Sequence, residues 1–202
     1  STSKEGDVDG SLRSGFIRRF KEKPAPHEAF SNVINAGLYI IEPEVIDLIP
    51  EGEKFDFSKQ LFPMVLEKGW PMYAKAINGV WFDVGSPDEL IRAQHVLIEQ
   101  RNSLPFPMPD GSVDGNGSFV SNNAHLGSNV ELHKSIVATD CSVGNESSLH
   151  ETVLMQGASV GSNVSLSGCI LSPGAIVEDN ISATNLVLGD NECLKSDDNR
   201  IL

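Results

Sequence analysis

The C-terminal half of the sequence repeats with a period of 17 residues. The positions that keep this spacing are almost all aliphatic: Leu126, Val143, Val160 and Val177; Val130, Ser147, Val164 and Ile181; Ile136, Val153, Ile170 and Val187; Leu132, Leu149 and Leu166. Small or polar residues follow many of them, as in "LGSNV" and "VGNES". This pattern predicts stacked coils with three short strand faces, in which the apolar residues point inward and Gly or Asn residues form the corners.

The repeat resembles the hexapeptide-repeat left-handed parallel β-helix, in which three six-residue units form each coil. The coil here is one residue shorter, so one corner must be tighter. We predict about four 17-residue coils over residues 119–190, followed by a tail at 191–202. The open ends of a short coil stack expose strand edges and apolar positions, which predicts a homo-oligomer formed through the β-helix.

Two histidines share one phase of the repeat. His133 and His150 are therefore expected on adjacent coils, roughly 5 Å apart, which is the spacing between neighbouring strands. Such a pair has the chemistry to bind a metal or to line an acyl-transfer site. Ser167 and Thr184 continue the same track without ligand chemistry, and this favours ordinary surface histidines.

Residues 1–100 alternate between strand-like and helix-like segments, which is typical of a mixed α/β fold. The predicted elements are strands at 14–20 and 32–43, a short helix at 43–50, a helix at 57–69, a hairpin within 73–85 and a helix at 86–101. Residues 101–118 combine prolines, glycines and polar residues, and this composition predicts a linker.

The stretch "VWFDVGSPDEL" places one carboxylate, Asp83, just before a helix start. Ser86 and Glu89 have the spacing of a capping box, with Pro87 at the first helical position. Upstream, a predicted turn at residues 78–79 joins two short strands. Asp83 would then lie near the carboxyl end of a strand, where open α/β sheets usually place their ligand sites.

Three motifs occur in order: "FKEKP" (Phe20–Pro24), "NAGLYI" (Asn35–Ile40) and "WFDVGSPDEL" (Trp81–Leu90). Together they resemble the second half of the Rossmann-like domain of the sugar-phosphate nucleotidyltransferases. These enzymes, which include the mannose-1-phosphate guanylyltransferases and glucose-1-phosphate nucleotidyltransferases, join an NTP and a sugar-1-phosphate into an NDP-sugar and release pyrophosphate. An appended β-helix recurs in the same enzymes.

The resemblance implies a role for particular residues. Lys23 is similar to the family lysine that binds the sugar phosphate. Glu22 and the backbone around Asn35 and Gly37 are similar to the groups that bind the sugar hydroxyls. Asp83 resembles the carboxylate that holds Mg²⁺ together with a second aspartate. Lys23 and Asp83 are therefore the expected catalytic residues, and Asp83 is also the expected metal ligand.

The family's glycine-rich phosphate-binding loop, of the type G-x-G-T-R, is not found in the sequence, and neither is the second aspartate. Residues 1–100 are therefore expected to form the sugar-phosphate-binding half of a nucleotidyltransferase domain without its nucleotide-binding half. Two alternatives stay open: a non-catalytic oligomerisation or regulatory subunit, and a hexapeptide acyltransferase.

Composition narrows the range of partners. The formal net charge of −13 over 202 residues argues against broad binding to nucleic acid or to anionic membranes. No run reaches the roughly 20 apolar residues of a membrane span, and the N-terminus lacks the apolar core of a signal peptide, so a cytoplasmic location is expected. The three cysteines show no C-x-x-C spacing and predict neither a disulfide framework nor a zinc site.

Overall fold

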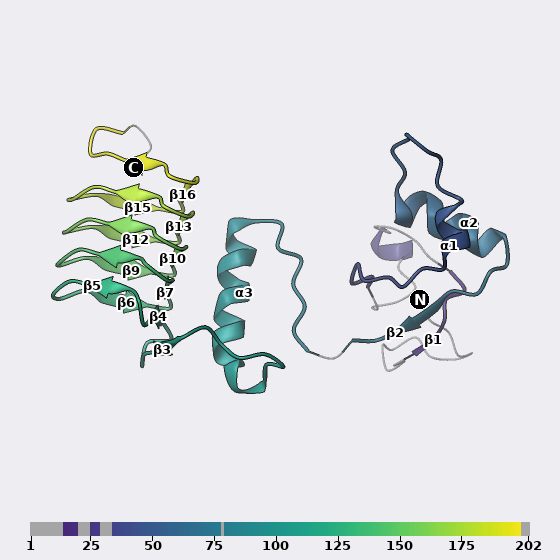
Figure 1. Ribbon diagram of the computed structural model, residues 1–202, viewed down its shortest axis with the longest axis horizontal. Coiled ribbons are helices and arrows are strands. Elements are labelled where there is room, and N and C mark those ends of the chain that lie inside the picture. Colours follow the sequence, from purple (N-terminus) through teal and green to yellow (C-terminus); the bar gives the residue numbers. More distant parts are fainter. Residues whose placement is uncertain (1–13, 20–24, 29–33, 78, 199–202) are drawn as a thin grey trace. The chain divides into compact units, whose positions relative to one another are not determined.

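The computed structural model describes residues 14–19, 25–28, 34–77 and 79–198. The chain divides into two compact units, Ser1–Trp81 and Phe82–Leu202 (Figure 1). In the part of the chain that is described, no helix has the length and apolar character needed to cross a membrane.

The first unit combines short helices with a small sheet. Its elements are β1 (Ser14–Phe16), η1 (Pro26–Glu28), α1 (Pro43–Ile46), η2 (Phe57–Leu61), α2 (Phe62–Glu67) and β2 (Tyr73–Lys75). The side chain of Asp56 caps η2 by accepting a hydrogen bond from the backbone N–H of Lys59 (2.8 Å). The apolar face of η2 and α2 supplies the buried residues Leu61, Phe62 and Val65. The helices predicted to begin at Pro43 and Phe57 are confirmed.

Two predicted strand assignments in this unit are wrong. Residues 34–42 contain no strand, although the sequence predicts one over 32–43. The predicted hairpin within 73–85 is not formed either, because β2 pairs antiparallel with β1 and residues 79–85 form no strand. Strands need a neighbour to hydrogen-bond, and among the described residues only the β1–β2 pair has one in this unit. Asn78, in the predicted turn, lies outside the described residues.

The second unit begins with helix α3 (Pro87–Glu99). The side-chain oxygen of Ser86 accepts a hydrogen bond from the backbone N–H of Glu89 (3.3 Å), and Pro87 follows as the first helical residue, so the predicted start is confirmed. A short 3-10 turn, η3 (Arg101–Ser103), and strand β3 (Gly111–Val113) come next. Strand β3 pairs antiparallel with β4 (Phe119–Ser121), the first strand of the repeating region.

The repeating region is a parallel β-helix with three sheet faces. One face contains β4, β7 (Ile136–Val137), β10 (Val153–Leu154), β13 (Ile170–Leu171) and β16 (Val187–Leu188); the next contains β5 (His125–Leu126), β8 (Ser142–Val143), β11 (Ser159–Val160), β14 (Ile176–Val177) and β17 (Cys193–Leu194); the third contains β6 (Glu131–His133), β9 (Ser148–His150), β12 (Ser165–Ser167) and β15 (Ser182–Thr184). Each strand pairs in parallel with its equivalent in the next coil, as Leu126 does with Val143 and Val160 with Val177. The predicted β-helix of about four 17-residue coils is confirmed.

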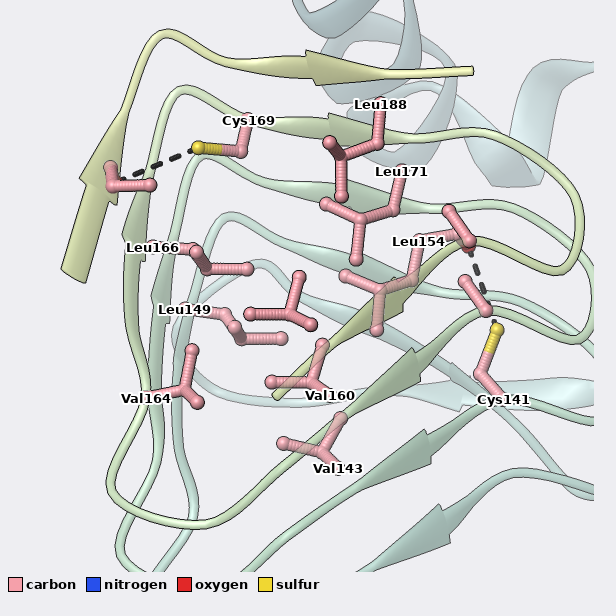
Figure 2. Close-up of a cluster of buried hydrophobic side chains, with 14 of the residues drawn as sticks. Cys141, Val143, Leu149, Leu154, Val160, Val164, Leu166, Cys169, Leu171 and Leu188 are labelled. Atoms are coloured by element: carbon pink, nitrogen blue, oxygen red, sulfur yellow. Dashed lines mark hydrogen bonds between the residues drawn. The ribbon is translucent and has the colours of Figure 1, made fainter. Parts of the chain in front are cut away.

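The core of the β-helix consists of stacked aliphatic side chains (Figure 2). Leu154, Leu171 and Leu188 form one stack, and Leu149 and Leu166 form another; all five are almost completely buried. In-register pairing places equivalent side chains directly above one another, so each coil buries its apolar residues against those of its neighbours.

One predicted track faces outward. Ile136, Val153 and Ile170 pack with Ile91 and Ile98 of α3 in a second cluster, outside the coil interior. The inward positions of these strands belong to the next residue along the chain, Val137 in β7 and its equivalents in the later coils. Successive residues of a strand point to opposite faces, and both faces of this sheet are apolar because α3 covers the outer one.

Each coil turns at three corners where the backbone φ is positive. The corner residues are Asn129, Glu146, Asn163 and Asn180; Lys134, Glu151, Gly168 and Asn185; and Asp140, Gly157, Gly174 and Asn191. Asparagine, aspartate and glycine tolerate this left-handed conformation best, and the prediction that Gly and Asn form corners is confirmed at most of these positions. Lys134, Glu146 and Glu151 adopt it despite lacking that preference, at φ values of 44°, 56° and 44°.

At one corner, a ladder of buried side-chain hydroxyls accepts hydrogen bonds from backbone N–H groups. The hydroxyl of Ser118 accepts from the N–H of Ser135 (3.1 Å), the hydroxyl of Ser135 accepts from the N–H of Thr152 (3.1 Å), and that of Thr152 accepts from the N–H of Cys169 (3.3 Å). The Ser135 hydroxyl also donates to the carbonyl of Leu149 (3.0 Å). Burial raises the pKa of the Cys169 thiol, which therefore stays protonated as a small, weakly polar core group.

Helix α3 covers part of the outer face of one sheet. Substitutions of two valines in the same 17-residue track should therefore differ in their effect on the free energy of unfolding. Val153→Ala removes a side chain that is 2% exposed, whereas Val187→Ala removes one that is 45% exposed in the same sheet. We expect the first change to lower the free energy of unfolding by about 2 kcal/mol and the second by less than about 1 kcal/mol. Urea unfolding of both variants measures this, and equal losses would contradict the packing of α3.

The hydroxyl ladder predicts that substitutions of two serines differ in their effect on the free energy of unfolding. Ser135→Ala leaves the buried N–H of Thr152 and carbonyl of Leu149 without this hydroxyl, so we expect a loss of about 1–3 kcal/mol in unfolding free energy. Ser142→Ala is the control, because the Ser142 side chain is exposed and donates to the hydroxyl of Ser159 (3.2 Å); its expected effect is within about 0.5 kcal/mol. Comparable stability of the two variants in the same urea titration would refute a structural role for the ladder.

Candidate functional site

The segment Asn35–Ile40 begins with a tight side-chain-stabilised turn. The side-chain oxygen of Asn35 accepts a hydrogen bond from the backbone N–H of Gly37 (2.9 Å), and its amide nitrogen donates to the hydroxyl of Tyr39. Asparagine favours such turns because its short side chain mimics a backbone carbonyl. Gly37 adopts a φ of +75°, a conformation that other residues rarely adopt.

Packing orients the far side of this turn. The ring of Tyr39 lies against those of Phe57 and Phe62, with centroid distances of 5.9 and 5.0 Å. Helices η2 and α2 thereby fix the ring whose hydroxyl receives the Asn35 hydrogen bond. Among the described residues, no atom lies within 4 Å of a Cβ added to Gly37, so they leave space beside this glycine for a ligand.

Trp81 joins two of the three sequence motifs. Its indole N–H donates to the carbonyl of Ala36 (3.1 Å), across 45 residues of sequence. The structure thus brings Asn35 and Gly37 together with the tryptophan that opens "WFDVG". No local signal in the sequence predicts this hydrogen bond, because Trp81 and Ala36 meet only through the tertiary structure.

Asp83 follows two residues later, in the second unit, and its side chain is exposed. Its backbone carbonyl accepts from the N–H of Gly85 (2.9 Å), and the neighbouring Phe82 ring packs against the guanidinium of Arg92 (4.9 Å). The Asp83 carboxylate is the type of hard oxygen ligand that Mg²⁺ prefers. Within the described residues, no group of three or more His, Cys, Asp or Glu side chains is placed to hold a metal. The metal role of Asp83 therefore stays a prediction.

Glu22 and Lys23, the remaining predicted site residues, lie outside the described residues. Their predicted contacts with the sugar and its phosphate therefore stay predictions. Asn35 and Gly37 are the predicted site residues whose mutual geometry is known.

The histidine pair of the β-helix has the predicted stacking. The rings of His133 and His150 are parallel within 1°, and their centroids lie 4.7 Å apart. The in-plane lone pairs of parallel rings point in the same direction and do not converge on one ion. The stack by itself therefore specifies neither a metal site nor an acyl-transfer site.

A separate histidine contact was not anticipated from the sequence. The ring nitrogen Nε2 of His95, on α3, lies 2.6 Å from the carbonyl oxygen of Lys134, at a corner of the β-helix. A ring N–H that donates to this carbonyl helps to hold α3 on the β-helix beside the Ile91 and Ile98 contacts. The only sequence signal for it is the helical spacing of His95 with these apolar residues.

The Asn35 turn predicts that two substitutions of Asn35 differ in their effect on hydrogen exchange at the Gly37 amide. Asn35→Ala removes the oxygen that accepts from the Gly37 N–H, whereas Asn35→Asp keeps an acceptor at that position. We expect hydrogen exchange at the Gly37 amide to accelerate about fivefold in Asn35→Ala, the equivalent of about 1 kcal/mol, and to change little in Asn35→Asp. Exchange followed by NMR measures this, and unchanged protection in the alanine variant would contradict the turn.

Comparison with curated proteins identifies relatives among sugar-1-phosphate nucleotidyltransferases. A UTP–glucose-1-phosphate uridylyltransferase of Synechocystis is 42% identical over 95 residues, which are 46% of this chain and 24% of the relative. Mannose-1-phosphate guanyltransferase beta-B of Xenopus laevis is 33% identical over 129 residues, 63% of this chain and 34% of the relative. The chain thus spans about a quarter to a third of the length of these relatives.

Among solved structures, a mutant perosamine N-acetyltransferase from Caulobacter crescentus in complex with CoA and GDP-perosamine is similar at 16% identity. The match covers 68% of this chain and 67% of that one, with a TM-score of 0.36. This likeness is too low to carry an argument about function.

The family comparison assigns almost the whole chain in two parts. Residues 6–100 match the family described as nucleotidyl transferase, and residues 110–193 match the GlmU-like C-terminal hexapeptide family. The first range contains the Asn35 turn, Trp81 and Asp83, and the second contains the coils of the β-helix. Residues 6–100 therefore belong to the nucleotidyl transferase family, as part of such a domain, and residues 110–193 belong to the GlmU-like hexapeptide family, as a left-handed β-helix.

Proposed function

We propose that this chain is the sugar-phosphate-binding part of a Mg²⁺-dependent enzyme that transfers a nucleotidyl group from an NTP to a sugar-1-phosphate. The products are an NDP-sugar and pyrophosphate. The observation that carries the proposal is the hydrogen bond from Trp81 to Ala36, because it links the first residue of one family motif to another of the family's motifs. The relatives named as uridylyltransferase and guanyltransferase support the reaction class.

The reaction brings two anions together, since an oxygen of the sugar phosphate attacks the α-phosphate of the NTP. Its demands are neutralisation of charge and an in-line arrangement of the attacking and leaving oxygens. In this proposal the ammonium group of Lys23 neutralises and positions the sugar phosphate. Glu22, the Asn35 side chain and the main chain near Gly37 bind the sugar hydroxyls. The glycine suits that role because its main chain is unobstructed.

Asp83 would supply a carboxylate ligand to Mg²⁺, and the bound ion would offset negative charge on the phosphates. A single exposed carboxylate gives only part of such a site, so the proposal requires a second carboxylate from the nucleotide-binding part of the enzyme. The relatives are three to four times longer than the matched segments, which leaves room for that part.

We also propose that the β-helix mediates self-association. Within the described residues, β15, β16 and β17 are the last strands of their sheets, so each presents one unpaired edge at the end of the coil stack. Ile176 (43% exposed) and Val187 (45% exposed) add apolar surface near that end. The cytoplasmic location expected from the sequence remains a prediction.

The proposed role of Asp83 predicts a loss of activity without a loss of structure. In the complete enzyme that carries these residues, we expect Asp83→Asn to lower the rate of pyrophosphate release by about 10²–10³-fold. The side chain is exposed, so the thermal unfolding midpoint should not change. The measurement is a coupled pyrophosphate assay with Mg²⁺, four NTPs and the 1-phosphates of mannose, glucose and N-acetylglucosamine.

Asp88→Asn is the matched control, because Asp88 is also exposed and lies in the first turn of α3, five residues away. Its expected activity is within about twofold of the unchanged enzyme. Full activity of the Asp83 variant would refute its role at the metal. The 202-residue chain alone is expected to release no pyrophosphate, and turnover by it would show that nucleotide binding needs no further polypeptide.

A further inference from the structure

The short segment that carries Asp83, residues 82–86, is fixed to helix α3 at its C-terminal end. The hydroxyl of Ser86 accepts a hydrogen bond from the backbone N–H of Glu89 (3.3 Å) and so caps the helix. Just before the cap, the carbonyl of Asp83 accepts from the N–H of Gly85 (2.9 Å), so the chain turns tightly there. The main chain at this end of the segment is therefore set by the start of α3.

The N-terminal end of the segment is attached to the same helix through a side chain. The guanidinium carbon of Arg92, in the second turn of α3, lies over the ring of Phe82, 4.9 Å from its centroid. Phe82 is half-buried, whereas residues 83–86 are all exposed. An arginine is attracted to the face of an aromatic ring and also covers its apolar surface. Asp83 therefore lies between two attachments to one helix, a ring contact before it and a cap after it.

Arg92 is itself held by Glu89, three residues earlier on α3. Its Nε lies 3.3 and 3.2 Å from the two carboxylate oxygens, and its Nη2 donates to one of them at 2.8 Å. A guanidinium is planar, so donation from two of its nitrogens to one carboxylate fixes the plane of the whole group. An exposed ion pair of this kind adds little stability, and its consequence here is the orientation of the guanidinium.

These contacts form a closed circuit. Phe82 contacts Arg92, and Arg92 binds the carboxylate of Glu89. The N–H of Glu89 donates to Ser86, and residues 83–85 join Ser86 back to Phe82 along the chain. The carboxylate proposed to bind the metal lies on this last stretch. Within the described residues, no hydrogen bond or ion pair holds that carboxylate itself, so the circuit limits the directions in which it can point.

We propose that Arg92 is a positioning residue for the proposed metal ligand: by stacking on Phe82 it orders residues 82–86 and so holds Asp83 in place for the cation. This inference rests on the proposed function, because it takes the role of Asp83 from there. A direct role of Arg92 as a phosphate ligand fits less well. Two of its nitrogens already donate to Glu89, and the ring of Phe82 covers one of its faces.

The first readout is the order of the segment in the 202-residue chain, which does not depend on activity. Arg92→Ala removes the guanidinium from Phe82, and we expect the NMR order parameters of the amides of residues 83–85 to fall from about 0.8 to about 0.6 or lower. Arg92→Lys keeps a cation but loses the forked contact with Glu89, so its values should lie between. Arg101→Ala is the matched control, because Arg101 is also exposed and lies beyond the other end of α3.

The same measurement tests whether the arginine acts through the ring. Phe82→Leu removes the aromatic face and keeps an apolar side chain. If Arg92 orders the segment through Phe82, the double variant loses no more order than the more affected of the two single variants, because both changes break one interaction. Additive losses would overturn the proposed route.

The second readout is the Mg²⁺ dependence of pyrophosphate release by the complete enzyme that carries these residues. We expect Arg92→Ala to raise the Mg²⁺ concentration for half-maximal rate about fivefold, because groups that orient a metal ligand affect metal affinity. The rate at saturating Mg²⁺ and the KM for the sugar-1-phosphate should stay within about twofold. Arg92→Lys should restore part of the Mg²⁺ affinity, and Arg101→Ala should leave it within about twofold.

Unchanged order in Arg92→Ala would overturn the proposal. A raised KM for the sugar-1-phosphate at unchanged Mg²⁺ dependence would also overturn it, because that result would identify Arg92 as a phosphate ligand. Loss of order without either kinetic change would support Arg92 as the residue that orders the segment. It would contradict the role of Asp83 at the metal, which belongs to the proposed function.

Discussion

Pairing between residues 17 apart is the constraint on which most of this structure depends. Each short strand of the β-helix hydrogen-bonds to its equivalent in the next coil, as Ser148 does with Ser165 and Val143 with Val160. A shift of one residue in any coil would move its inward leucines and valines to the outer surface. The register therefore fixes the core, the corners and the hydroxyl ladder together, and it also fixes the sheet on which α3 packs.

That regularity explains what could be predicted from the sequence about the β-helix. A period is visible in one dimension, so the coils, their number and the stacking of His133 on His150 followed directly from it. The period did not predict to which face of the sheet each side chain points. Ile136 and Val137 are both apolar, and only the position of α3 shows that the first faces the helix and the second faces the coil interior. An apolar track can lie on either face of a sheet that is covered on both sides.

The same distinction applies to the first unit. Local signals were sufficient for the capped start of α3 at Ser86 and for the helices that begin at Pro43 and Phe57, because caps and helical periodicity depend on residues a few positions apart. The hairpin within 73–85 and the strand at 32–43 failed because a strand requires a partner, which local sequence cannot provide. For the candidate site, the motifs pointed to Asn35 and Gly37, but only the fold shows that Trp81 holds that turn from 45 residues away.

The two units thus differ in where their stability comes from. The β-helix is stabilised by contacts at a short and constant sequence separation, so each coil needs only its neighbours. The described residues of the first unit have a small core, a two-stranded sheet and exposed Leu38 and Ile40, so fewer buried contacts hold this unit together. The proposed sugar-binding turn lies in the unit with the smaller described core. Its geometry is consequently the part of this chain that assembly can alter most, whereas the β-helix offers a rigid platform that assembly can use without changing it.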